Sequence, residues 1–91
     1  QMVLLGRKTA REKLASFLIT LSHRMLRLGK LEDELDLPMS RADIADYLGL
    51  TTETVSRTFT HFRTAGLIEL PKAGGARLRN RGALAKISEG H

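Results

Sequence analysis

A chain of 91 residues is long enough for one small domain with a single modest core. Because 42% of its residues are hydrophobic and no apolar run reaches the length of a bilayer span, its composition argues against disorder and against a membrane-spanning helix. The absence of cysteine excludes a disulfide framework, a thiolate zinc site and an iron–sulfur cluster within these residues, and the net charge of +5 is typical of domains that bind nucleic acid.

The first residues give expectations about the whole protein. The chain starts at Gln1 rather than Met, which we interpret as the sign of a fragment of a longer chain. The apolar residues 1–5 are too few for a signal peptide and have no small-residue cleavage site behind them. Gly6 then predicts a break or hinge, so we expect residues 1–7 to end a preceding element and residues 8–91 to form the domain.

The first predicted element of the domain is a helix over residues 8–28. Its apolar residues recur at helical spacing and form one stripe, made of Leu14, Phe17, Leu18, Leu21, Met25 and Leu28. Gly29 is a plausible stop, and residues 30–37 predict a polar loop that runs into a short strand before Pro38. A leucine and methionine stripe of this kind indicates core packing rather than a ligand site.

Two shorter helices are predicted next. Ser40 can cap a helix over residues 41–48, because its hydroxyl can accept a backbone N–H and Asp43 suits the positive end of the helix. Gly49 follows where a tight turn can require a positive φ. Thr51 or Thr52 then caps a helix that runs to about residue 65, with Gly66 just past its end.

The last third of the chain predicts a hairpin and a closing helix. Residues 67–70 and 76–79 have strand composition and are joined by the turn-rich residues 71–75, and a helix over residues 80–88 follows. The order is helix, short strand, helix, turn, helix and hairpin. The sequence therefore predicts a mainly α fold with a small β-hairpin, a winged helix-turn-helix.

The spacing at the turn supports this fold. Two helices that cross steeply need a small residue where they approach, a special turn, and a branched apolar residue where the second helix packs back. Ala45, Gly49 and Val55 meet these needs at offsets of 0, +4 and +10. At about 100° per residue, Val55, Phe59 and Phe62 share the inner face of the second helix. Its outward face near the N-terminal end presents Glu53, Ser56 and Arg57.

These three side chains suit contacts to DNA bases. Arg57 can donate two parallel hydrogen bonds to O6 and N7 of guanine. Glu53 can accept from N4 of cytosine and can also orient the arginine one turn away. Ser56 is small enough to approach a thymine and can donate or accept a hydrogen bond. The alternative is an ordinary Glu–Arg pair on a solvated helix face, which the position after Ala45 and Gly49 disfavours.

Contacts to DNA phosphates can be assigned to four residues. Thr51 and Thr52 lie at the start of the predicted second helix of the motif, and Arg41 lies at the start of the preceding helix. Lys72 lies in the loop of the predicted hairpin over residues 67–79, which forms the wing. Four further residues can serve either as phosphate contacts or as solvated polar groups: His61, Arg63, Arg77 and Arg79.

The run from Met39 to Arg57 resembles the DNA-binding motif of the Crp/Fnr family of bacterial transcription regulators, and the likeness continues to Ile68. Residues 5–13 resemble the segment after the family's long dimerisation helix, particularly in FixK and FnrN-like members. The signature Glu-x-x-Ser-Arg reads a TTGA-containing half-site in Fnr-type proteins. Crp-type members carry an arginine before the glutamate, where this chain has Thr52. One departure is Thr58, where many such motifs place leucine or isoleucine, and we expect Phe59 and Phe62 to cover the difference.

The resemblance implies an activator with an N-terminal effector-sensing domain, absent here, and a dimerisation helix whose end and hinge would be residues 1–7. It implies a cytoplasmic homodimer that binds double-stranded DNA at a palindromic operator and recruits RNA polymerase, with no membrane partner. No cofactor is expected in this domain, and the sequence does not identify one for the sensor domain.

Two other classes of function compete with this interpretation. An enzyme is disfavoured, because His23, His61 and His91 lack metal-ligand spacing and no catalytic set is present. A winged helix used for protein–protein contact or for non-specific DNA binding is the stronger rival, because acidic proteins and membrane surfaces also attract a basic domain.

Overall fold

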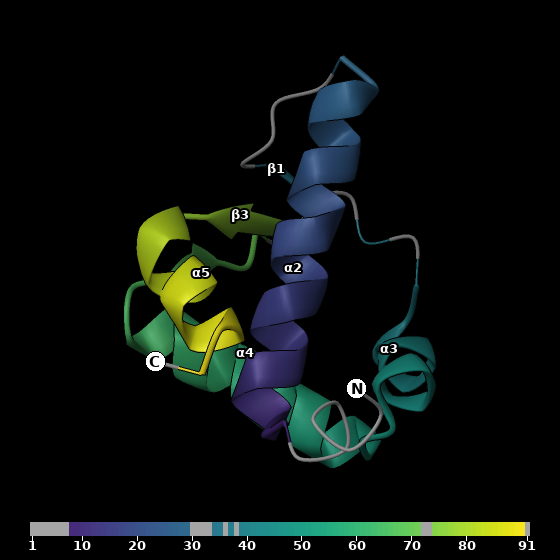
Figure 1. Ribbon diagram of the computed structural model, residues 1–91. Helices are drawn as coiled ribbons and strands as arrows, with labels where there is room; N and C mark the ends of the chain where they lie inside the picture. The colour runs from purple at the N-terminus through teal and green to yellow at the C-terminus, as the bar shows by residue number, and fades with distance from the viewer. Residues whose placement is uncertain (1–7, 30–33, 36, 38, 72–73, 91) are drawn as a thin grey trace.

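The computed structural model describes residues 8–29, 34–35, 37, 39–71 and 74–90. The longest helix, α2, crosses the domain, with α5 and the sheet against it and with α3 and α4 toward its N-terminal end (Figure 1). The elements in chain order are α2 (Ala10–Arg27), β1 (Glu34–Leu35), α3 (Arg41–Leu48), α4 (Thr52–Thr64), β2 (Ile68–Glu69), β3 (Ala76–Leu78) and α5 (Arg81–Ser88). The predicted winged helix-turn-helix is confirmed.

Side-chain caps determine where the helices begin. The predicted caps of α3 and α4 are confirmed, since Ser40 accepts from the backbone N–H of Asp43 and Thr51 accepts from that of Thr54, each at 3.1 Å. A cap that the sequence prediction missed lies at Thr9, where a reciprocal pair with Glu12 starts α2 two residues later than expected. Gly49 ends α3 with a φ of 71°, in the left-handed region as predicted.

The sheet has three strands rather than the two of the predicted hairpin. Strand β3 lies in the middle and pairs antiparallel with both β1 and β2, in the order β1-β3-β2. The pairing of β2 with β3 confirms the hairpin. The short strand expected before Pro38 is β1, which pairs with β3 across more than 40 residues of chain. Strands of two or three residues carry too little pattern to reveal this partner in the sequence.

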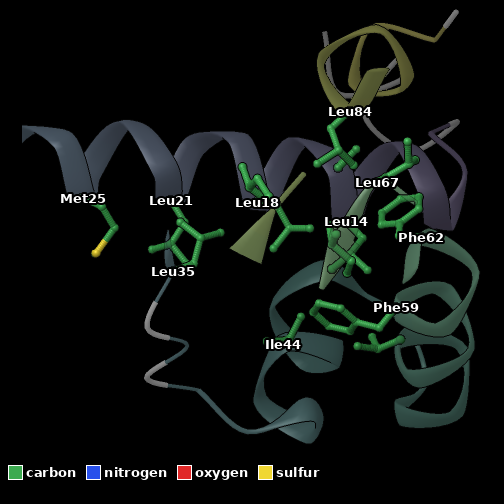
Figure 2. Packing of buried hydrophobic residues seen from close by; sticks show 14 of the residues in the cluster. Leu14, Leu18, Leu21, Met25, Leu35, Ile44, Phe59, Phe62, Leu67 and Leu84 are labelled. Carbon is green, nitrogen blue, oxygen red and sulfur yellow. The ribbon is translucent and has the colours of Figure 1, made fainter. Parts of the chain in front are cut away.

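One continuous core joins all the helices and the sheet. Leu14, Leu18, Leu21 and Met25 of α2 point to the same side, toward Leu35 of β1 and the side chains of α3 and α4 (Figure 2). The predicted inner face of α4 is confirmed, since Val55, Phe59 and Phe62 are fully buried. Leu28 was expected in the α2 stripe but is 64% exposed, because the helix ends at Arg27 and the chain turns away.

Thr58 belongs to the buried side of α4 as well. Its side chain is 6% exposed, and its hydroxyl donates to the backbone carbonyl of Thr54 at 2.7 Å. A buried hydroxyl needs such a partner, and the helix supplies it one turn back. A threonine can therefore replace the usual apolar residue here, because α4 itself satisfies its hydroxyl. The neighbouring Phe59 and Phe62 are fully buried on the same side of the helix.

Candidate nucleic-acid interface

The outward face of α4 carries a solvent-exposed ion pair near its N-terminal end. The Arg57 guanidinium donates to the Glu53 carboxylate at 2.5 Å, and the two side chains are 75% and 77% exposed. Burial of Val55 on the opposite side of the helix fixes this orientation. Ser56 lies beside the pair and is half-buried. The structure thus places the three predicted base-reading residues on one accessible helix face, with the arginine held by the glutamate.

The start of α4 is arranged around the Thr51 hydroxyl. This oxygen accepts from the backbone N–H of Thr54 and donates to the Thr54 hydroxyl at 2.8 Å, so both of its hydrogen-bonding roles are occupied within the chain. Thr52 is the first helical residue and is exposed. Backbone N–H groups at a helix start attract anions, so this end of α4 suits a phosphate through its backbone as well as through Thr52.

Arg41 joins the two helices of the motif in a way that the sequence did not reveal. Its guanidinium carbon lies 4.1 Å from the centroid of the Phe59 ring, although the two residues are 18 positions apart and lie on different helices. The side chain is half-buried, and burial lowers the pKa of the Arg41 guanidinium below its usual value. The group stays charged, because the pKa of arginine starts far above neutrality. Arg41 therefore stabilises the contact between α3 and α4, and its role as a phosphate contact stays a prediction.

The arginines of the wing form ion pairs with a glutamate on the neighbouring strand. Glu69 of β2 pairs with Arg79 and lies 3.6 Å from the Arg77 guanidinium. Arg77 also stands opposite both Glu34 and Glu69 in the strand register. These ion pairs favour the interpretation of Arg77 and Arg79 as surface charges of the sheet. Lys72, the predicted wing contact, lies outside the described residues.

The sequence model of the family described as "Crp-like helix-turn-helix domain" matches residues 12–87, which include α3, α4, the sheet and most of the two flanking helices. The chain belongs to this family. It is thus the DNA-binding domain of a Crp/Fnr-type transcription regulator, as the resemblance implied.

The Crp-like domain is similar to FixK proteins. It is 56% identical over 73 residues to the nitrogen fixation regulation protein FixK of Bradyrhizobium diazoefficiens, a match that covers 80% of this chain and 31% of the relative. It is 48% identical to the FixK protein of Azorhizobium caulinodans, covering 94% of this chain and 35% of the relative. The chain thus spans about a third of the length of these curated relatives.

A solved structure supports the same assignment. FixK2 from Bradyrhizobium japonicum superposes on the Crp-like domain with a TM-score of 0.82 at 45% identity, over 94% of this chain and 41% of that chain. The resemblance to FixK-like members of the family is therefore confirmed, together with the fold. The individual roles of Glu53, Ser56, Arg57 and the phosphate-contact residues stay predictions.

Within residues 8–29, 34–35, 37, 39–71 and 74–90, no three histidine or acidic side chains lie close enough to hold a metal ion. In the same ranges no helix is sufficiently long and apolar to cross a membrane.

Proposed function

We propose that this domain reads a TTGA-containing palindromic operator through the exposed face of α4. The observation that carries the proposal is the Glu53–Arg57 pair, which is exposed at the N-terminal end of the second helix of a helix-turn-helix. Side chains at this end of the helix are the ones that reach base edges in the major groove. The identity of Thr52, where Crp-type members have arginine, favours the Fnr-type half-site.

The pair matches the single G·C base pair of TTGA. Arg57 can donate to O6 and N7 of the guanine, while Glu53 can accept from N4 of the cytosine in the opposite strand. The hydrogen bond between the two side chains limits the rotamers of the arginine before DNA arrives, which lowers the entropy lost on binding. Ser56 lies on the flank of this face, where its small side chain leaves room for a neighbouring thymine methyl group.

Contacts to the DNA backbone would fix the register of α4 in the groove. We assign them to Arg41, Thr51, Thr52 and Lys72, of which Thr51 would act through its backbone because its hydroxyl already caps the helix. Such contacts carry no sequence information but contribute most of the dependence of binding on salt.

The rest of the function concerns the longer protein. We propose that it acts in the cytoplasm as a homodimer, with one α4 in each half-site, and that it recruits RNA polymerase as a transcription activator. Effector sensing would belong to a separate N-terminal domain, and we propose that the domain described here needs no cofactor of its own. Support comes from the family and from the FixK relatives, which are about three times as long as this chain.

The test compares the affinity of this chain for a TTGA duplex with its affinity for a scrambled duplex at fixed salt. Arg57→Ala is expected to cost about 1–3 kcal/mol of binding free energy on the TTGA duplex and to relax discrimination at the guanine. Arg24→Ala removes the same charge from an exposed position near the C-terminal end of α2 and serves as the matched control.

Lys72→Ala should instead weaken binding to both duplexes alike and lower the salt slope. Equal affinities of the unsubstituted chain for the two duplexes would favour the rival function, a winged helix for protein contact or non-specific DNA binding. Full discrimination by Arg57→Ala would overturn the role of that residue.

A further inference from the structure

A lysine of the long helix holds the end of the first helix of the motif. The Lys13 ammonium on α2 donates to the backbone carbonyl of Leu48 at 3.1 Å, across 35 residues of chain. Leu48 is the last residue of α3. Carbonyls at the end of a helix lack partners within the helix and carry the negative end of its dipole. A cation is therefore well suited to this position, and no local sequence signal indicates it.

Outside the core, the lysine contact crosses a groove between α2 and α3. This open groove has a volume of about 530 Å³, and the residues that line it include Lys8, Lys13, Phe17, Tyr47 and Leu48. The Phe17 and Tyr47 rings meet with their centroids 6.0 Å apart, but Tyr47 remains 72% exposed. Packing therefore closes this junction only in part, and the Lys13 hydrogen bond crosses it.

The turn after Leu48 holds α3 and α4 in a fixed relative orientation. The backbone N–H of Leu50 donates to the carbonyl of Ala45 at 2.8 Å, which fixes the turn tightly against α3. Arg41 over the Phe59 ring joins the same two helices at another point. The two helices therefore form one unit, and Glu53 follows Leu48 by only five residues.

We propose that Lys13 is a positioning residue for DNA recognition, which sets the N-terminal end of α4 relative to the frame formed by α2 and the sheet. This inference rests on the proposed function, in which α4 and the wing contact one duplex together. Both contacts can be made at once only if the two elements keep a fixed spacing, and base contacts tolerate little displacement. Lys13 supplies this constraint at the end of α4 that carries the base-reading side chains.

The test uses this chain, whose core is continuous, with three substitutions. Lys13→Met removes the donor and keeps the side-chain length, Lys13→Arg keeps a charged donor, and Lys86→Met removes the same charge from an exposed position on α5. Lys13→Met is expected to bind the TTGA duplex up to about 10-fold more weakly, the loss that follows if the free energy of this hydrogen bond serves to hold α4 in its binding geometry. Binding to the scrambled duplex and the salt slope should match those of Lys86→Met, and Lys13→Arg should recover most of the affinity.

Two results would overturn the inference. Equal losses on both duplexes with a salt slope lower by about one would identify Lys13 as a phosphate contact instead. An unchanged ratio of affinities, with only a lower melting temperature, would assign it a purely structural role. If Lys13→Met does not fold, Lys13→Gln provides the same comparison. Arg57→Ala run in parallel separates the two proposals, because retained discrimination in that variant contradicts the proposed function itself.

Discussion

The stacking of Arg41 on Phe59 makes a quantitative prediction about the stability of the helix-turn-helix. The guanidinium lies 4.1 Å from the ring centroid, well within the range of about 6 Å over which a cation is attracted to an aromatic face. The ring is fully buried and the arginine is half-buried, so water weakens the attraction less than it does at an exposed pair. We therefore expect a coupling of about 1 kcal/mol between the two side chains.

A double-mutant cycle measures this coupling. Arg41→Met keeps the length and the apolar stem of the side chain, and Phe59→Leu keeps an apolar residue without the aromatic face. Each single substitution should lower the free energy of unfolding, and the double variant should lose about 1 kcal/mol less than the sum of the two. Urea unfolding of the four proteins gives the values, and Arg63→Met, at an exposed position of α4, controls for the loss of charge.

Additivity would refute this reasoning. Suppose that the losses in unfolding free energy of the two single variants add up to the loss of the double variant within about 0.5 kcal/mol. The contact between Arg41 and Phe59 then contributes nothing beyond packing. A coupling that disappears in high salt would also contradict it, since that behaviour belongs to exposed charges rather than to a partly buried cation over a ring. DNA binding by Arg41→Met addresses a separate point, because only a phosphate contact at Arg41 would lower the salt slope.

Two further predictions concern the turn and the core. Gly49→Ala should destabilise the domain by about 1–2 kcal/mol, because a φ of 71° is strained for alanine. Gly82→Ala in α5 should instead stabilise the domain by about 0.5–1 kcal/mol, because alanine favours the helix. The melting temperatures of the two variants should therefore shift in opposite directions. Leu18→Ala should cost about 3 kcal/mol in urea unfolding because Leu18 is fully buried, while Leu26→Ala, at a side chain 56% exposed, should change stability by less than about 1 kcal/mol.

The sequence by itself determined the features that depend on residues close together in the chain. The spacing of Val55, Phe59 and Phe62 established which face of α4 is buried, and therefore that Glu53 and Arg57 are exposed. The cap of α3 and the turn after it were predicted for the same reason, since Ser40 bonds a residue three positions away and Gly49 meets a conformational need of its own backbone. The Thr9–Glu12 cap of α2 is equally local but was missed. Interactions within one turn of helix leave a pattern in a short window of sequence.

Only the tertiary structure decided the contacts between distant segments. The pairing of β1 with β3, the stack of Arg41 on Phe59 and the hydrogen bond from Lys13 to Leu48 join residues that are 18 or more positions apart. Long polar side chains such as arginine and lysine can reach many partners, so their residue type does not indicate which one they meet. The packing of α2 against the motif selects the partner, and that packing depends on the whole core rather than on any one stretch of sequence.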